Sequence, residues 1–107
     1  MIKANNIIKT KKEYERVSKK LTEAEKKGDI IQILKYKRIV YDYEIRLFDI
    51  DIQLYNIYDE VYRNVFIDRY INDMDIELMV DKYRISRSNL YKIVNKAKEQ
   101  FEGSIWV

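Results

Sequence analysis

The chain has 107 residues with a formal net charge of +3, and it contains no histidine, cysteine or proline and only two glycines. This length suits one small domain, with or without a helical arm, and leaves no room for a large catalytic core. Without histidine and cysteine the usual general base and soft-metal ligands are missing, so we expect no enzyme activity, cofactor, metal or small-molecule substrate. Because helix-breaking residues are nearly absent and 47% of the residues are hydrophobic, we predict an all-α chain.

The first predicted element is a helix with a sparse apolar stripe. Four apolar residues recur at helical spacing among Lys and Glu side chains: Tyr14, Val17, Leu21 and Ala24. Gly28-Asp29 then marks the end of this helix and the N-cap of the next one. We therefore predict that residues 1–53 form a helical hairpin or a long helical arm, and that this arm serves oligomerisation.

From Ile30 onward a second helix is predicted, with an apolar face that needs a partner. Apolar residues fall at seven-residue intervals, as in a coiled coil: Leu34, Tyr41, Phe48, Tyr55 and Tyr62, with Ile45 and Ile52 between them. A continuous helix over residues 29–54 would be about 40 Å long, which exceeds the width of a small compact domain. This face therefore needs the first helix, a second subunit or both, and we favour a homodimer.

A strand is the alternative in this region. Residues 41–47 and 50–54 alternate strictly between apolar and polar side chains, which is typical of strands. No Gly, Pro or Asn-Gly turn lies between the two runs, so a hairpin has no loop to use. We prefer the helix, and leave open whether residues 39–54 form one continuous helix.

The C-terminal half, residues 54–107, reads as three helices in succession. An apolar stripe over residues 57–70 predicts a scaffold helix, with Asp68 outside the stripe. The next helix should begin near Asp73, where three acids suit the exposed amides of a helix start, and its apolar face comprises Ile76, Met79, Val80 and Tyr83. After the buried turn residue Ile85, Ser86 serves as N-cap of the third helix, whose packing face comprises Leu90, Ile93, Val94, Ala97 and Phe101.

The opposite side of this third helix is polar and basic. Two short helices joined by a tight turn form a helix-turn-helix motif, in which the N-terminal part of the second helix enters the major groove of DNA. Arg suits guanine and Asn suits adenine, because each can form a bidentate pair there. The residues expected to reach bases are Arg87, Ser88, Asn89, Tyr91, Lys92 and Asn95, and those expected to hold phosphates are Lys82, Arg84, Ser86, Lys96 and Lys98.

The same residues carry a family resemblance. Arg69-Tyr70, the acidic helix after it and the run from Tyr83 to Lys98 resemble region four of bacterial sigma factors and the small phage regulators of the RinA and ArpU type. The resemblance covers about the C-terminal half. It implies control of transcription through binding to promoter-region DNA, and it places at the base-reading positions Arg87, Ser88, Asn89 and Lys92. In sigma factors this unit also touches RNA polymerase, which leaves RNA polymerase as a candidate partner here.

The chain departs from the family pattern in the turn. Arg84 stands where the family usually has Gly. A left-handed backbone costs Arg more than Gly, so we expect a slightly different turn geometry or a different length of the second helix.

Charge is segregated along the chain. Residues 1–20 carry seven basic and two acidic side chains, residues 39–81 three and eleven, and residues 82–107 six and two. A basic end that coincides with the third helix supplies the attraction that DNA phosphates require. The acidic middle should face away from DNA or toward a protein partner such as RNA polymerase. The alternative to both roles is that the Lys-rich face and the acidic face are simply the solvated sides of amphipathic helices.

Aromatic residues are numerous, with ten tyrosines and one tryptophan. Most tyrosines lie on apolar stripes, so core packing is predicted for Tyr41, Tyr55, Tyr62, Tyr70 and Tyr83. Trp106, after a helix stop at Gly103, is predicted to dock on the chain's own core.

Together these patterns predict a sequence-specific transcription regulator that binds double-stranded DNA. Its composition indicates an AT-rich genome, such as that of a low-GC bacterium, a phage or a mobile element. No apolar run approaches the roughly 20 residues that span a bilayer, so we expect a cytoplasmic protein of the bacterial host cell without membrane contact. The alternative is a small terminase-like or structural helical oligomer that binds DNA without promoter specificity.

Overall fold

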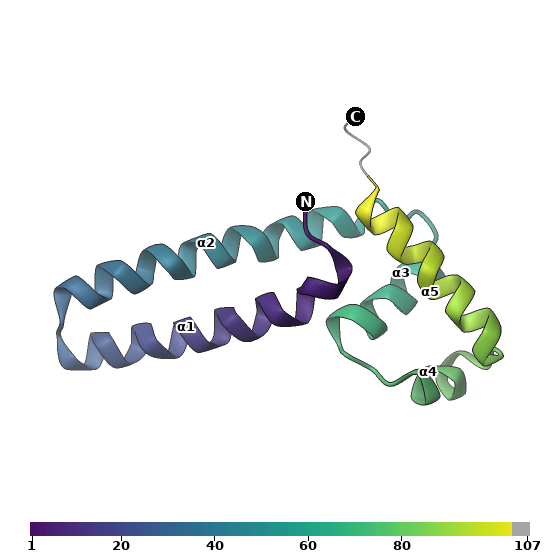
Figure 1. Ribbon diagram of the computed structural model, residues 1–107, viewed down its shortest axis with the longest axis horizontal. Coiled ribbons are helices and arrows are strands. Elements are labelled where there is room, and N and C mark those ends of the chain that lie inside the picture. Colours follow the sequence, from purple (N-terminus) through teal and green to yellow (C-terminus); the bar gives the residue numbers. More distant parts are fainter. Residues whose placement is uncertain (104–107) are drawn as a thin grey trace.

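The computed structural model describes residues 1–103, and these residues contain helices and no strand, which confirms the all-α prediction. A short 3-10 turn, Ala4–Asn6, leads into two long helices, α1 (Ile7–Lys27) and α2 (Ile30–Leu54), which form an antiparallel hairpin (Figure 1). Shorter helices follow: α3 (Glu60–Phe66), the π-helical turn η2 (Ile67–Ile71), α4 (Ile76–Tyr83) and α5 (Arg87–Glu102). The predicted position of Trp106 lies outside the described residues.

The tip of the hairpin forms as its sequence predicts. Gly28 adopts the left-handed conformation that ends α1, with φ of 68°, and its N–H reaches the carbonyl oxygens of Ala24 and Glu25. Asp29 then caps α2, because its carboxylate accepts the backbone N–H of Gln32 at 3.2 Å. The second helix continues unbroken to Leu54, so the residues that alternate like a strand are helical.

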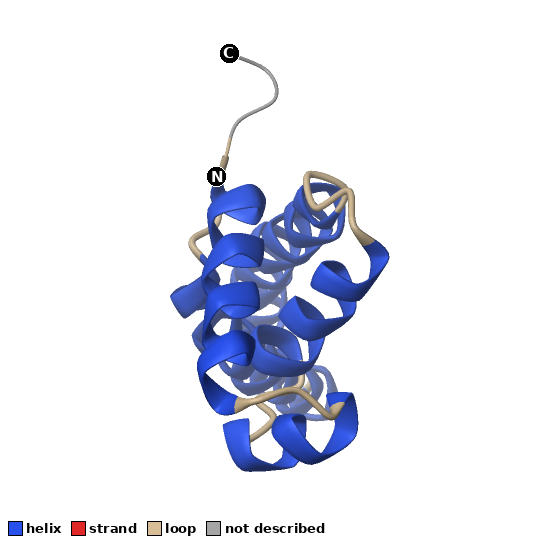
Figure 2. Cartoon of the chain, turned by 90° about the vertical axis from the view of Figure 1, so that its right-hand side faces the viewer, coloured by secondary structure: helices blue, strands red, loops and turns tan. Residues whose placement is uncertain are grey.

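One hydrophobic core joins the base of the hairpin to the C-terminal helices. It brings together side chains from the first turn, α1, α2, α3, α5 and the segment before α3: Ala4, Ile7, Ile50, Ile57, Phe66, Ala97 and Phe101. Phe66 and Phe101 stack at its centre with ring centroids 4.4 Å apart. Seen end-on in Figure 2, the shorter helices stand across the end of the hairpin. The core therefore crosses residue 53, where the sequence suggested that the arm ends.

Two buried amides reinforce this junction. Gln53 accepts the N–H of Ile2 at 2.7 Å and donates to the carbonyl oxygens of Ile2 and Phe101 at 3.0 and 3.3 Å. Asn56 donates to the carbonyl oxygens of Phe101 and Gly103 at 3.4 and 2.9 Å, where α5 leaves carbonyls unpaired. The first residues, the end of α2 and the end of α5 are therefore held as one body.

Two helices begin later than predicted. The scaffold helix starts at Glu60, because Asp59 caps it through the N–H of Tyr62, and it passes into the π-helical turn after Phe66. The next helix starts at Ile76 and not near Asp73, since Asp73 itself has φ of 55° and cannot belong to a right-handed helix. Asp73 and Asp75 thus lie in the loop before α4, and only Glu77 is in its first turn.

The prediction for the tyrosines holds only in part. Tyr62 and Tyr70 are half-buried against the core at the base of the hairpin, and Tyr83 is half-buried against a second cluster between α3, α4 and α5. Tyr41 and Tyr55 are 60% and 74% exposed, so their assignment to the core of a single chain is wrong. The reason is that α1 packs against the opposite side of α2. None of the helices within residues 1–103 is long and apolar enough to cross a membrane.

Candidate nucleic-acid interface

The turn between α4 and α5 has the geometry of a tight helix-turn-helix connection. Arg84 ends α4 in the left-handed conformation, with φ of 53° and ψ of 44°, and its N–H donates to the carbonyl oxygen of Val80 at 2.9 Å. Ser86 then caps α5, since its hydroxyl oxygen accepts the N–H of Asn89 at 3.2 Å. Arg84 therefore takes the conformation that the family pattern usually assigns to Gly.

Packing fixes which side of α5 faces outward. The predicted packing residues Leu90, Val94, Ala97 and Phe101 are buried, and Ile93 is half-buried. Leu90 and Val94 join Val65 of α3 and the α4 residues Ile76 and Met79 in a second core cluster. This cluster holds α4 across α5, so the opposite side of α5 is left to solvent.

All of the predicted base-reading residues lie on the exposed part of α5. Tyr91 is 44% exposed. The other five are exposed as well: Arg87, Ser88, Asn89, Lys92 and Asn95. The Arg87 guanidinium forms an ion pair with the carboxylate of Glu77 on α4, and both side chains remain more than half exposed. This pair directs the side chain of Arg87, the first residue of α5, toward α4.

The residues predicted to hold phosphates do not share one environment, unlike the predicted base-reading residues. Arg84, Ser86 and Lys96 are exposed, although the Ser86 hydroxyl oxygen already serves the helix cap, and Lys98 is half-buried. Lys82 donates from its ammonium to the carboxylate of Asp68 at 2.7 Å. This ion pair gives Lys82 a structural contact that the sequence did not indicate.

Asp68 connects the turn after α3 to the end of α4. It lies in the π-helical turn, is only 6% exposed, and accepts hydrogen bonds from Lys82, the Tyr83 hydroxyl and, at 3.3 Å, the Asn72 amide. Burial alone would raise the pKa of Asp68, but these hydrogen bonds outweigh it and keep the pKa below its ordinary value. Burial and the bond to Asp68 together raise the pKa of Tyr83. A charged carboxylate therefore ties the end of α4 to the turn after α3.

Sequence reasoning missed this cluster and the amide junction. Asp68 was expected among the polar side chains outside the apolar stripe, and Gln53 received no role. Their partners lie 15 and 51 residues away in the chain, so helical periodicity contains no signal for them. The contact of Asp68 with Lys82 and Tyr83 can be recognised only from the structure, in which the turn after α3 lies against the end of α4.

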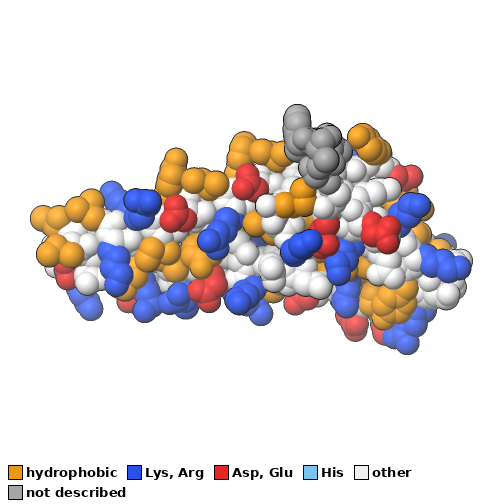
Figure 3. All heavy atoms as spheres, turned by 45° about the horizontal axis from the view of Figure 1, so that its top comes forward, with side chains coloured by type: hydrophobic (Ala, Val, Ile, Leu, Met, Phe, Trp, Pro, Cys, Tyr) orange, Lys and Arg blue, Asp and Glu red, His pale blue; other side chains and the backbone are white. Residues whose placement is uncertain are grey.

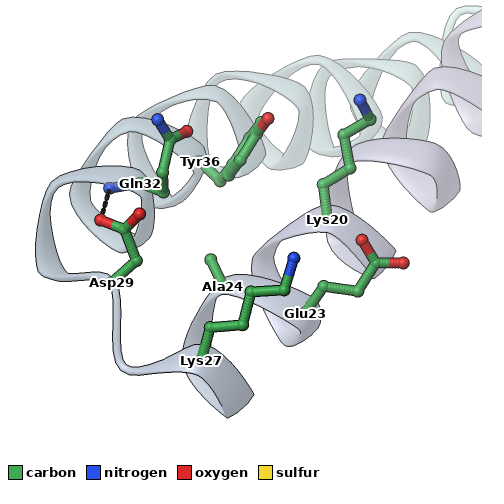
Figure 4. A pocket seen from close by; sticks show the side chains of 7 residues that line it. All are labelled: Lys20, Glu23, Ala24, Lys27, Asp29, Gln32 and Tyr36. Atoms are coloured by element: carbon green, nitrogen blue, oxygen red, sulfur yellow. Dashed lines mark hydrogen bonds between the residues drawn. The ribbon is translucent and has the colours of Figure 1, made fainter.

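A hollow lies at the far end of the hairpin from α5. It has a volume of about 230 Å³ and is lined by charges of both signs, among them Lys20, Glu23 and Lys27, beside the ring of Tyr36 (Figure 4). Figure 4 also shows the Asp29 cap at its rim. Mixed charges of this kind give no preference for one ligand, so α5 remains the candidate interface.

Comparison with known protein families, curated proteins and solved structures gives no match for this chain.

Proposed function

We propose that this chain is a transcription regulator that binds specific double-stranded DNA by inserting the N-terminal part of α5 into the major groove. The observation that carries the proposal is the division of α5, with one face buried against α3 and α4 and the other exposing the side chains that can bond to base edges. The capped start of α5 behind a tight turn is the geometry by which helix-turn-helix proteins enter the groove.

The residues divide into two groups in this proposal. Arg87, Ser88, Asn89 and Lys92 contact bases, with Tyr91 and Asn95 beside them. Arg84 and Lys96 contact the backbone phosphates on either side. Lys82 contributes mainly by holding Asp68, since its ammonium is already bonded there.

The test is a titration with duplex DNA selected from a random pool, at several salt concentrations and with nonspecific competitor. Arg87→Ala should weaken binding to the preferred site by about 1–3 kcal/mol and relax its specificity. Lys96→Ala should weaken all sequences alike and lower the salt dependence by about one phosphate contact. Lys19→Ala, an exposed basic residue of α1, is the matched control and should change little. The proposal fails if Arg87→Ala and Lys92→Ala bind every duplex as well as the parent.

The ion pair between Glu77 and Arg87 allows a second test with the opposite sign. Glu77 competes with DNA for the Arg87 guanidinium and adds a negative charge beside the groove. Glu77→Gln should therefore bind DNA more tightly, by up to about 1 kcal/mol, which is the range of exposed pairs. A weaker affinity of Glu77→Gln than of the parent at low salt would contradict competition between Glu77 and DNA for Arg87.

A second candidate function is a small terminase-like or structural helical oligomer that binds DNA without promoter specificity. The exposed apolar face of α2 favours it, because such a face suits assembly. The native mass separates the two functions, since a ring of many subunits would speak against a regulator. So would equal affinity for all sequences in the competitor titration.

A further inference from the structure

An apolar stripe runs along the side of α2 that α1 leaves uncovered. This stripe, called the α2 seam, consists of seven side chains between 44% and 77% exposed: Ile31, Leu34, Tyr41, Ile45, Phe48, Ile52 and Tyr55. The side of α2 toward α1 has its own buried or half-buried residues, among them Val40, Leu47 and Ile50. In Figure 3 hydrophobic side chains gather along this exposed side of the arm. The helix thus has two apolar sides, and the hairpin uses one.

The α2 seam is large enough for a stable interface. At these exposed fractions the seven side chains present on the order of 800 Å² of mostly apolar surface, which matches the roughly 800 Å² that each partner contributes to a standard interface. Monomeric proteins rarely leave a continuous patch of this kind exposed. Apart from the step of seven residues between Leu34 and Tyr41, the seam residues are three and four apart, like alternating a and d positions in a coiled coil. The fitting partner is therefore another helix with the same spacing.

Charges beside the seam indicate which helix that is and in which direction it runs. On both flanks the N-terminal part of α2 is basic, with Lys35 and Lys37, and the C-terminal part is acidic, with Asp49 and Asp51. Within residues 1–103 none of these four side chains has an intrachain salt bridge. A second α2 running in the opposite direction would place acidic ends beside basic ends.

We infer that two copies of this chain dimerise through the α2 seam with their α2 helices antiparallel. Pairing each a position with a d position of the other copy places Leu34 against the partner's Ile52 and Tyr41 against the partner's Ile45. Arg38 occupies the position between Leu34 and Tyr41, where the apolar seam is interrupted, and it meets the ring of the partner's Phe48 in a cation–π contact. Lys35 then lies beside the partner's Asp49, and Lys37 beside the partner's Asp51.

A parallel pair is less favourable for the same sequence. It would stack Arg38 on the same residue of the other copy in the middle of the interface, and would place Glu44 beside the partner's Asp49. The antiparallel pair avoids both contacts. Its like-charged neighbours are confined to the two-fold axis, at Asp42 and Glu44. The dimer carries its two helix-turn-helix units at opposite ends, and the inference does not depend on what they bind.

The molecular mass of the parent and of seam variants in solution tests whether the α2 seam is a dimer interface. Sedimentation equilibrium of the parent should give twice the chain mass of 13.1 kDa. Tyr41→Glu should raise the dissociation constant at least about a hundredfold, because each copy would bury a carboxylate against the partner's Ile45, close to the acidic Asp42 and Glu44 at the two-fold axis. Since Tyr41 is 60% exposed in the single chain, the circular dichroism spectrum should not change. Leu78→Glu, at an equally exposed apolar residue of α4, is the matched control and should remain dimeric. A parent that is still monomeric at about 0.1 mM, which is 100-fold above a micromolar dissociation constant, overturns the inference, and so does a dimeric Tyr41→Glu.

Cross-linking tests the direction, and the absence of native cysteine makes it unambiguous. Variants L34C and I52C are oxidised separately and as an equimolar mixture. The antiparallel pair predicts a disulfide-linked dimer only in the mixture, whereas a parallel pair predicts one in each variant alone. The two positions lie about 27 Å apart along one helix, so they cannot be linked within a chain. Cross-links in the separate variants and none between L34C and I52C would refute the antiparallel arrangement.

Discussion

Substitutions at Arg84 can separate the effect of the turn's backbone conformation on stability from the effect of the side-chain charge on DNA binding. Its φ of 53° lies in the left-handed region, which costs an L-residue about 1–2 kcal/mol, while Gly adopts it freely and loses about 0.5–1 kcal/mol in chain entropy on folding. Within residues 1–103 the Arg84 side chain has no hydrogen bond or ion pair that its removal would break, and it is exposed. Arg84→Gly should therefore raise the free energy of unfolding by about 0.5–1 kcal/mol.

The matched control is Arg84→Ala, which removes the same guanidinium but keeps a Cβ in the left-handed region. Its stability should stay within about 0.5 kcal/mol of the parent, so the two variants should differ by about 2–8 °C in melting temperature. Urea denaturation and thermal melts followed by circular dichroism measure the difference. In a DNA titration both variants should lose the same affinity, since both lack the proposed phosphate contact. If Arg84→Gly is no more stable than Arg84→Ala, the turn is not left-handed at this residue.

Three further predictions concern the contacts that hold the unit together. Asp68→Asn should lower the free energy of unfolding by about 1–3 kcal/mol at neutral pH. Because the folded-state pKa of Asp68 is depressed, this difference should be complete above about pH 5 and shrink as the pH falls through the ordinary value of 3.8, in urea titrations at stepped pH. Gln53→Ala should cost about 1–3 kcal/mol by leaving the partly buried backbone N–H and carbonyl of Ile2 unpaired, and should speed hydrogen exchange at the N–H of Ile2. Phe101→Ala should cost about 3–5 kcal/mol in chemical denaturation, because Phe101 is fully buried and stacks on Phe66; a loss below 1 kcal/mol would contradict the described core.

The parts of the fold that the sequence predicted are those with local causes. Gly28 and Asp29 mark the hairpin tip because a left-handed glycine and a capping carboxylate act on their own neighbours. Ser86 and the buried face of α5 were predictable for the same reason. Both a helix cap and a helical periodicity depend only on residues that are close together in the sequence.

The start of α4 was misplaced because acids before a helix were taken as its first turn. The positive φ of Asp73 ends any helix there, and neither Gly nor Pro marks this position in the sequence. The two apolar sides of α2 were also indistinguishable from sequence, so Tyr41 and Tyr55 were assigned to a core that the single chain does not provide. Which side α1 covers depends on tertiary packing.

The junction of the two chain ends has a consequence for the order of folding. The N–H of Ala4 donates to the carboxylate of Glu102 at 2.8 Å across 98 residues of sequence, and Ile7 shares a core with Phe101. Contacts of such long sequence separation form slowly, whereas α1 and α2 are neighbours in the chain and can pair at once. During synthesis the hairpin is therefore complete while its base still lacks the cover of α5. Until α5 leaves the ribosome, the apolar base of the hairpin remains a surface to which chaperones or other nascent chains can bind.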